Sequence, residues 1–450
     1  MHNSHASTVP AEALGGSMRD FRDLHGTDLI ERVAPFHRWQ SVRRDHGLWP
    51  YSRSTEEAPR AVCAARDDSG HRFRGVNFGS QDYLSLASHP AIKEAAKATI
   101  DEYGVHSAGS SALSGNTTYS LRLEEAIAEF LGLNHAVLYP TGWAAGYGVI
   151  RGLVRSDDHV VMDGLSHACL QEGAHAATRN VHLHGHLNLD SVRRHLRRIR
   201  ERDAVNAILV VTESLFSMDS DTPDLRALQA LCREFGATLL VDVAHDLGCL
   251  GPNGRGHIGA QGMLGKVDLV MGSFSKTFAS NGGFVACSAP AVKQYLKFYG
   301  SSATFSNALS PVQCATVLKV LEIVQSNDGQ RLRDMMLDRA IYLRAMLARA
   351  GFRVIGNPSA IVPVVAGSEG LARMASRRLT QLGAVANLVE YPAVAKGNAR
   401  FRLQVMAQHS REDCDEMVRC LRRAVDECIA PMPTEAAPHV QAPKPELVAA

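Results

Sequence analysis

The stretch VDLVMGSFSKTFASNGGF, residues 267–284, joins an apolar run to a loop of small residues that carries one lysine, Lys276. The run from Val267 to Met271 has the length and composition of a buried strand. The serines and glycines that follow leave space around the lysine. A lysine in such a loop is usually a solvated surface charge, so residues elsewhere in the chain must show whether Lys276 has a chemical role.

Short apolar runs like this one recur upstream and alternate with segments of helical periodicity, such as residues 224–236. They lie at 135–142, 158–164, 206–215 and 237–245. This alternation predicts an α/β fold with a mostly parallel central sheet and helices on both faces. Ligands of such sheets bind beyond the carboxyl ends of the strands. The polar residues near these strand ends are Thr141, Asp163, Glu213, Asp242 and Ser273.

The character of the sequence changes near residue 330, where a long amphipathic helical pattern is followed by short apolar runs. We expect a large domain at 76–330 and a smaller C-terminal α+β domain at 331–430. Residues 1–75 are expected to form an N-terminal arm or extension. The Pro- and Ala-rich residues 431–450 are expected to form a disordered tail.

The bulk composition is that of an ordinary globular protein, with 45% hydrophobic and 21% charged residues among 450. The net charge of +2 gives no general electrostatic case for binding nucleic acid or an anionic membrane. Nine cysteines are scattered singly, which favours reduced thiols in a cytoplasmic protein. Neither a signal peptide nor a transmembrane segment is expected.

Asp242 and His245 lie at the end of the run at 237–245. A carboxylate after so apolar a strand requires a cationic partner or several hydrogen-bond donors. One interpretation is that Asp242 caps the next turn and that His245 is a loop histidine with its hydrogen bonds satisfied. The alternative is a ligand that carries a cationic ring nitrogen beside a hydroxyl group.

Pyridoxal 5'-phosphate (PLP) is such a ligand, because its pyridinium nitrogen needs an acidic partner and its aldehyde needs a lysine. Lys276 could supply that lysine. The phosphate needs backbone N–H groups at a helix start, together with hydroxyl groups. Thr141, Gly142 and Trp143 lie where a strand passes into a predicted helix, and Ser273 precedes the lysine.

The order of these segments resembles the α-oxoamine synthases, which are PLP-dependent transferases of fold type I. That family includes serine palmitoyltransferase and 8-amino-7-oxononanoate synthase. The resemblance covers roughly residues 75–425 and rests on segments that share one order and compatible spacing. These segments are NFGSQDYLSLASHPAIKEAA, GSSALSGNTTYSLRLEEAIAEFLG, YPTGWAAGYGVI, DGLSHACLQEGA, TESLFSMDSDTPDL, VDVAHDLGCLGPNGRG, GSFSKTFASNGGF and ARFRLQVMAQHS.

The resemblance implies a role for each matching residue. Lys276 would bind the cofactor aldehyde as a Schiff base and later move protons at the substrate Cα. Asp242 would pair with the pyridinium nitrogen, while His245 and Ser217 would contact the ring hydroxyl. His167 would stack on the ring and help to orient the substrate carboxylate.

The resemblance also implies sites for the two anionic groups. Ser273 and the backbone amides of Gly142 and Trp143 would bind the phosphate. Arg402 matches the arginine that binds the amino-acid carboxylate, and Arg400 is a nearby competitor for that role.

The chain departs from the family pattern at three places. Asp246 stands where many relatives have serine, and Ala112 follows a Ser-Ser pair where many have arginine. A Ser/Thr-rich turn that reaches the partner subunit's phosphate is represented here by a segment with Asn307 and Ala308. These changes bear on the substrate and the subunit interface more than on the cofactor.

The implied reaction is a decarboxylative Claisen condensation of serine, alanine or glycine with an acyl thioester, which gives an α-amino ketone. Coenzyme A or acyl carrier protein would carry the acyl group, and a serine palmitoyltransferase-like reaction is favoured. We expect a homodimer with the active site at its interface. Residues 29–51 could cover an acyl channel or dock a carrier protein.

Three other interpretations stay open. The chain could be another fold type I enzyme, such as an aldolase or aminotransferase. It could be a non-catalytic partner subunit, although that role predicts loss of Lys276. Finally, His182, His184 and His186 alternate as in a zinc-binding strand, but without an evident cysteine or carboxylate partner they favour a solvated strand, so we expect no metal.

Overall fold

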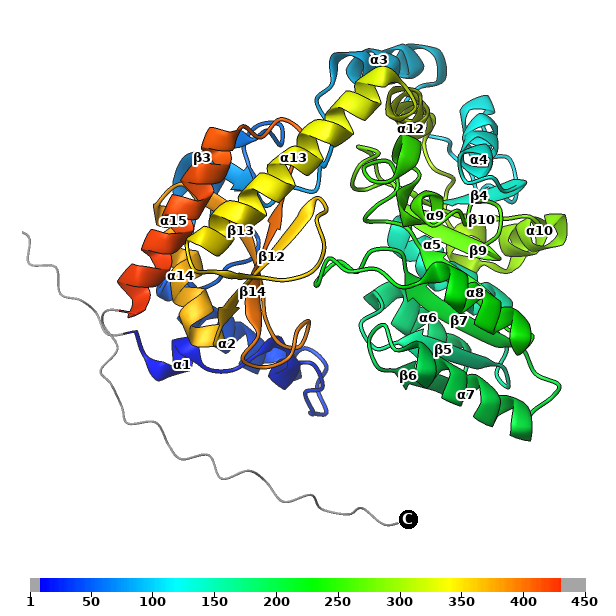
Figure 1. Ribbon diagram of the computed structural model, residues 1–450, viewed down its shortest axis with the longest axis horizontal. Helices are drawn as coiled ribbons and strands as arrows, with labels where there is room; N and C mark the ends of the chain where they lie inside the picture. The colour runs from blue at the N-terminus through cyan, green and yellow to red at the C-terminus, as the bar shows by residue number, and fades with distance from the viewer. Residues whose placement is uncertain (1–8, 430–450) are drawn as a thin grey trace, which may run out of the picture.

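Two seven-stranded sheets organise the chain into a larger and a smaller domain (Figure 1). The computed structural model describes residues 9–429, and the tail predicted at 431–450 lies outside the described residues. Helix α13 leads from the larger domain into the smaller one (Figure 1).

The larger sheet follows the order β4-β10-β9-β8-β7-β5-β6. β10 is antiparallel to β4 and β9, whereas the pairs from β9 to β6 are parallel. The prediction of a mostly parallel central sheet is therefore confirmed. The strands are β4 His135–Tyr139, β5 His159–Asp163, β6 Asn180–His184, β7 Ile208–Glu213, β8 Thr238–Asp242, β9 Leu269–Ser273 and β10 Gly283–Cys287.

Helices cover both faces of this sheet, with α5, α6, α10 and α11 on one face and α4, α7 and α8 on the other. On β7, the side chains of Leu209 and Val211 pack on the face covered by α5, α6, α10 and α11. The side chain of Val210 packs on the opposite face. Burial on both faces explains why these strands are continuous apolar runs. The helices are α3 Pro90–Tyr103, α4 Thr118–Phe130, α5 Gly142–Leu153, α6 Ala168–Ala177, α7 Leu189–Arg202, α8 Leu225–Glu234, η3 Pro252–Gly254, α9 Gly256–Ala260, α10 Pro290–Tyr299, α11 Ser301–Thr304 and α12 Pro311–Val324.

The smaller sheet follows the order β1-β2-β3-β13-β14-β12-β11. Its strands are β1 Ser54–Thr55, β2 Val62–Arg66, β3 Arg72–Phe78, β11 Arg353–Val354, β12 Ile361–Gly367, β13 Ala384–Val389 and β14 Ala399–Gln404. Helices α13 Asn327–Arg349, α14 Glu369–Gln381 and α15 Arg411–Ile429 complete this domain.

Strands β1 to β3 belong to the smaller domain, which differs from the sequence prediction of a separate arm at 1–75. β3 pairs in parallel with β13, more than 300 residues later, with Val76 opposite Ala384. A Cβ atom at Gly75 would lie 1.4 Å from the carbonyl oxygen of Gly383, so this close approach requires glycine. No local sequence pattern predicts that β3 pairs with β13.

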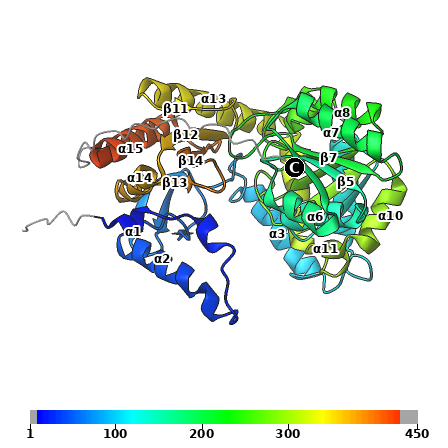
Figure 2. The same cartoon turned by 90° about the horizontal axis from the view of Figure 1, so that it is seen from below.

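The segment before β1 contains α1 Ala11–Leu14, η1 Met18–Phe21, η2 Glu31–Val33 and α2 Ala34–Asp45. It lies against the smaller domain, with α1 beside α14 (Figure 2). The buried Arg373 of α14 joins the two parts, because its Nε donates to Glu390 at 2.5 Å and its Nη2 donates to the carbonyl of Gly16 at 2.8 Å. Arg43 of α2 also donates to the Gly16 carbonyl, at 3.1 Å.

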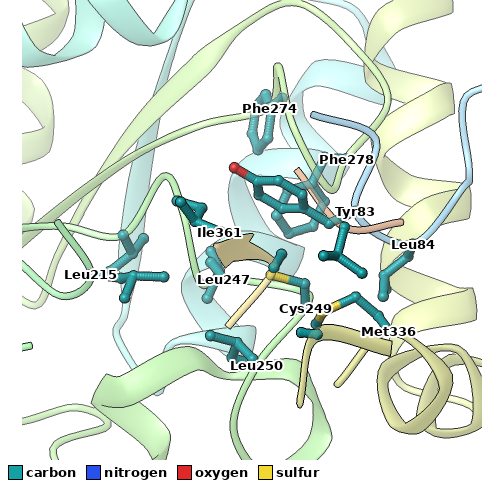
Figure 3. Close-up of a cluster of buried hydrophobic side chains, with 14 of the residues drawn as sticks. Tyr83, Leu84, Leu215, Leu247, Cys249, Leu250, Phe274, Phe278, Met336 and Ile361 are labelled. Atoms are coloured by element: carbon teal, nitrogen blue, oxygen red, sulfur yellow. The ribbon is translucent and has the colours of Figure 1, made fainter. Parts of the chain in front are cut away.

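A shared apolar cluster lies where the two domains meet (Figure 3). It draws side chains from the loop after β3, the segments after β7, β8 and β9, helix α13 and strand β12. The labelled members are Tyr83, Leu84, Leu215, Leu247, Cys249, Leu250, Phe274, Phe278, Met336 and Ile361. The domains therefore pack through a common core next to the loop that carries Lys276.

All nine cysteines are buried free thiols. Within residues 9–429, none of the helices combines the length and the apolar character that crossing a bilayer requires.

We expect Arg373→Ala to lower the free energy of unfolding by about 3–5 kcal/mol, because it leaves the Glu390 carboxylate buried without its cation. Arg378→Ala on the same helix is the matched control, since the Arg378–Glu427 ion pair is partly exposed and screened by solvent, and its loss should change stability much less. Urea denaturation measures both changes, and limited proteolysis reports release of residues 9–17. Equal stability losses in the two variants would contradict this role of Arg373.

Candidate active site

Four polar side chains lie at the ends of adjacent parallel strands of the larger sheet. Asp163 ends β5, Glu213 ends β7, Asp242 ends β8 and Ser273 ends β9. Glu213 and Asp242 are direct partners in the register of β7 and β8. Because parallel strands share one carboxyl edge, the sheet brings these groups to the place where a ligand is expected.

Asp242 is a buried carboxylate whose negative charge is only partly balanced by nearby cations and hydrogen-bond donors. Burial raises its pKa, while the Lys276 ammonium and His167 lower it. Its Oδ1 accepts a hydrogen bond from the Ala244 amide at 2.8 Å, and no other donor among residues 9–429 reaches the carboxylate. A cationic ring nitrogen would complete this environment.

Lys276 follows β9 and lines a cavity of about 410 Å³. Burial lowers the pKa of its ammonium group, while the Asp242 carboxylate raises it. Gln81 and Ser80, from the loop after β3, line the same cavity, and so does Pro59 from the loop after β1. This cavity reaches Lys276 from between the two domains, but Asp242, His167, His245 and Arg402 do not line it.

His245 is held by Tyr83, a residue outside the set of site residues predicted from the sequence. The Tyr83 Oη lies 2.9 Å from Nδ1 of the His245 ring. Burial, with the nearby Lys276 and Arg402 cations, lowers the pKa of His245 well below its usual value, so the ring is neutral. Tyr83 lies within one of the segments that resemble the family, but the sequence did not predict its contact with His245. The two residues are 162 positions apart, so no local pattern connects them.

His167 stands at the start of α6, and Glu213 anchors its backbone. The Glu213 Oε1 accepts a hydrogen bond from the His167 N–H at 2.7 Å. Burial, together with the Asp242 carboxylate, raises the pKa of Glu213 well above its usual value. The sequence placed Glu213 at a strand end without assigning a contact to it.

The structure distinguishes the two arginines of β14. Arg400 forms an ion pair with Asp219, and its Nη1 donates to the Met218 carbonyl at 3.2 Å. Arg402 is paired with no carboxylate within the described part of the chain, and its buried Nε has no hydrogen-bond partner. Its Nη1 lies 3.5 Å from the carbonyl oxygen of Ser217. Arg402 is therefore the cation that remains available to an anionic ligand.

Ser217 lies in the loop after β7, beside Arg402. Its predicted contact with the ring hydroxyl of the cofactor stays a prediction.

The start of α5 has the features of an anion site. Thr141 caps the helix by accepting a hydrogen bond from the Ala144 amide at 3.0 Å. The backbone amides of Gly142 and Trp143 stand in the first turn, where no intrahelical acceptor exists. A Cβ atom at Gly142 would lie 2.3 Å from Cβ of Ser273, so glycine lets the helix start approach the serine hydroxyl.

The histidines at 182–186 belong to local networks. His182 lies 3.1 Å from the ring of His159. His186 Nδ1 lies 3.1 Å from Asp163, and its Nε2 lies 3.0 Å from Asp221. Burial lowers the pKa of His186, but the two carboxylates outweigh this effect and raise it to about 10. His186, Asp219 and Asp221 lie close enough together to hold a metal ion, and the expected absence of a metal stays a prediction.

The departures from the family pattern have clear structural partners. Asp246 accepts hydrogen bonds from the Ser214 hydroxyl at 2.6 Å and the His257 amide at 2.7 Å. Ser110 forms a β-bridge with Asn307. Asp246 and Asn307 therefore take part in contacts that hold loops around the site, while the effect of Asn307 and Ala308 on a phosphate contact across a subunit interface stays a prediction.

The described residues fit PLP. The buried Asp242 carboxylate suits a pyridinium nitrogen, Lys276 suits the aldehyde, and the start of α5 with Ser273 suits the phosphate. The neutral His245 suits the ring hydroxyl.

Comparisons with known proteins agree with this fit. Residues 74–421 match the family model for aminotransferase class I and II. The chain is 36% identical over 335 residues to an 8-amino-7-oxononanoate synthase of Geobacter metallireducens, a match that covers 74% of this chain and 84% of that protein. It is 31% identical over 401 residues to the 4-hydroxy-2,2'-bipyrrole-5-methanol synthase of a Serratia species, a match that covers 89% of this chain and 60% of that protein.

Some relatives are much longer than the matched region. The chain spans 60% of the Serratia protein and 53% of a putative 8-amino-7-oxononanoate synthase 2 of Mycobacterium tuberculosis.

Among solved structures, serine palmitoyltransferase from S. paucimobilis, with PLP and myriocin bound, matches with a TM-score of 0.83 and 26% identity. That match covers 90% of this chain and all of the other. The fold type I architecture is therefore confirmed. The chain belongs to the aminotransferase class I and II family and, within it, to the PLP-dependent α-oxoamine synthases.

Proposed function

We propose that this chain condenses a small amino acid with an acyl thioester, releases CO2 and yields an α-amino ketone. The observation that carries the proposal is Arg402, whose Nε is buried and whose guanidinium has no carboxylate partner in residues 9–429, in the electrostatic neighbourhood of Lys276 and His245. A guanidinium in this setting suits the carboxylate of an amino acid.

The residues divide the chemistry between them. Bound PLP supplies an aldehyde that captures the substrate amine and a cationic ring that accepts electrons from the bonds at Cα. Asp242 holds that ring in its cationic form. Lys276 takes the Cα proton, and its lowered pKa increases the share of neutral amine available for this step.

The Cα carbon then attacks the thioester carbonyl, the C–S bond breaks and the sulfur leaves with the bonding electrons as a thiolate, which takes its proton from solvent. Loss of CO2 breaks the bond between Cα and the carboxyl carbon, and Lys276 returns a proton to Cα. Arg402 holds the carboxylate until that bond breaks, and a protonated Glu213 adds no second negative charge beside Asp242.

For the substrates, we propose serine, alanine or glycine with an acyl group on coenzyme A or a carrier protein. The likeness to serine palmitoyltransferase supports serine, and the likeness to 8-amino-7-oxononanoate synthases keeps other amino acids open. An aldolase or aminotransferase reaction is the alternative within the same fold. The presence of Lys276 argues against a non-catalytic subunit.

We further propose a homodimer whose interface includes the segments around Val105, Leu113 and Phe305. These side chains are 69%, 83% and 87% exposed. Their segments pair with each other through the Ser110–Asn307 bridge, which gathers exposed apolar groups on one surface. A second copy of the chain would cover them. The nine free cysteines also support a cytoplasmic location.

Spectral titration of the PLP-loaded protein tests the reaction. Glycine, alanine and serine are each added with and without an acyl thioester, and visible absorbance and CO2 release are measured. We expect one of the three amino acids to change the spectrum. With that amino acid, CO2 should be released only when thioester is present. Amino transfer or aldehyde release without thioester would instead identify the alternative reaction. Lys276→Ala should lose CO2 release and the absorption band of the lysine-bound cofactor.

The two β14 arginines should respond differently to lysine substitution. We expect Arg402→Lys to raise the KM for the amino acid about 10- to 100-fold, because it loses a bidentate pairing of about 1.5–3 kcal/mol. Arg400→Lys keeps a cation beside Asp219 and should leave this KM within about threefold, as expected for a residue outside the carboxylate site. Steady-state kinetics with saturating thioester measures both. A larger effect at Arg400 would reverse the assignment.

Phe305→Asp should weaken the dimer at least about tenfold, because burying a phenylalanine contributes about 1.5–3 kcal/mol. Val205→Asp is the control, since Val205 is 92% exposed on the loop after α7. Light scattering over a dilution series measures the dissociation constants. If both variants dissociate like the unsubstituted protein, the proposed interface is wrong.

A further inference from the structure

We propose that Cys169 locks His167 in one neutral tautomer, with the proton on Nε2, so that His167 acts as a fixed hydrogen-bond donor to the substrate. This inference rests on the proposed function for the identity of the substrate. It assigns Cys169 as a positioning residue that presents the Nε2–H of His167 to the substrate.

The backbone of Cys169 sets the direction of the first hydrogen bond. Its amide nitrogen lies 3.3 Å from Nδ1 of His167, in the N-cap arrangement at the start of α6. A backbone N–H can only donate, so Nδ1 must present its lone pair. A neutral imidazole with Nδ1 as acceptor carries its proton on Nε2.

The side chain of Cys169 adds a second contact to the same atom. Its Sγ lies 3.0 Å from Nδ1 of His167. Burial raises the pKa of this thiol, and the Asp242 carboxylate raises it further, so the sulfur keeps its proton and can donate. A Cβ atom at Gly146 would lie 2.4 Å from this sulfur, so glycine on α5 makes room for the thiol beside the ring.

The surroundings oppose a second proton on the ring. Nδ1 stands at the start of a ten-residue helix, where the backbone dipole disfavours a cation. Burial lowers the pKa of His167, and the Lys276 and Arg402 cations act in the same direction. Asp242 and Glu172 act in the opposite direction without reversing the shift. Triosephosphate isomerase uses the same device, in which a helix start keeps a catalytic histidine neutral.

Glu213 fixes the backbone of His167. It accepts the His167 backbone N–H at 2.7 Å, so the main chain and the ring nitrogen are both held. The remaining polar group of the side chain is the Nε2–H. That group can donate to an oxygen of the bound substrate, while proton movement at Cα is left to Lys276.

Nitrogen-15 NMR of the full-length, PLP-loaded protein labelled at histidine reads the tautomer directly. His167→Gln identifies the His167 signals by their loss. We expect a pyridine-type Nδ1 and a pyrrole-type Nε2 throughout the range of about pH 6 to 8, where an unperturbed histidine titrates. A proton on Nδ1, or titration to imidazolium near the ordinary pKa of about 6.5, would overturn the proposal.

Cys169 variants separate the thiol from the backbone amide. Cys169→Ser retains a donor and should keep the His167 pKa below its ordinary value. Cys169→Ala removes the side-chain donor and should move that pKa upward, toward the ordinary value. If both variants titrate like the unsubstituted protein, the thiol has no positioning role. This readout does not depend on turnover, so it remains decisive even if the proposed condensation fails.

Kinetics then tests the donor itself. The amide nitrogen of glutamine can take the place of Nε2–H, whereas that of asparagine stands closer to the Nδ1 position. We expect His167→Gln to retain about tenfold more kcat/KM for the amino acid than His167→Asn, as expected for one hydrogen bond to a charged group. Both variants lose the imidazole ring equally. Equal losses of kcat/KM would contradict the donor role of Nε2.

Discussion

The register between Glu213 and Asp242 is the constraint on which the site depends. Two carboxyl groups end neighbouring parallel strands, and both are buried. Two like charges in such a position cannot both be stable, so burial keeps a proton on Glu213. Asp242 then depends on nearby cations. The Lys276 ammonium supplies one, and the ring of PLP supplies the other when it is bound.

The smaller domain contributes the remaining charge. Arg402 comes from β14, whereas Lys276 and Asp242 come from the larger domain. The apolar cluster that includes Tyr83, Met336 and Ile361 packs these domains together (Figure 3). A guanidinium with a buried Nε and no carboxylate partner in residues 9–429 is costly, and the contacts between the domains must hold it in place. The carboxylate site therefore exists only when both domains have folded and joined.

Local patterns in the sequence predicted the residues at strand ends, because burial on both faces leaves a clear apolar run that stops at a polar residue. Lys276, Asp242 and the start of α5 follow from that pattern. The pairing of β3 with β13 could not be predicted, since it depends on a close approach between distant glycines. The contact between Tyr83 and His245 is equally non-local. Arg400 and Arg402 lie two residues apart on one strand, and only the position of Asp219 distinguishes them.

The protonation states around the cofactor site leave one main route for a mobile proton. His245 is buried and neutral, with Tyr83 at its Nδ1. Glu213 keeps its proton while it accepts the His167 amide. A general base must have a pKa near the working pH and access to the substrate. Of these groups, Lys276 has a pKa lowered from its usual high value and also lines the cavity. The burial that makes the carboxyl pair difficult to charge thus directs proton transfer at Cα to the lysine.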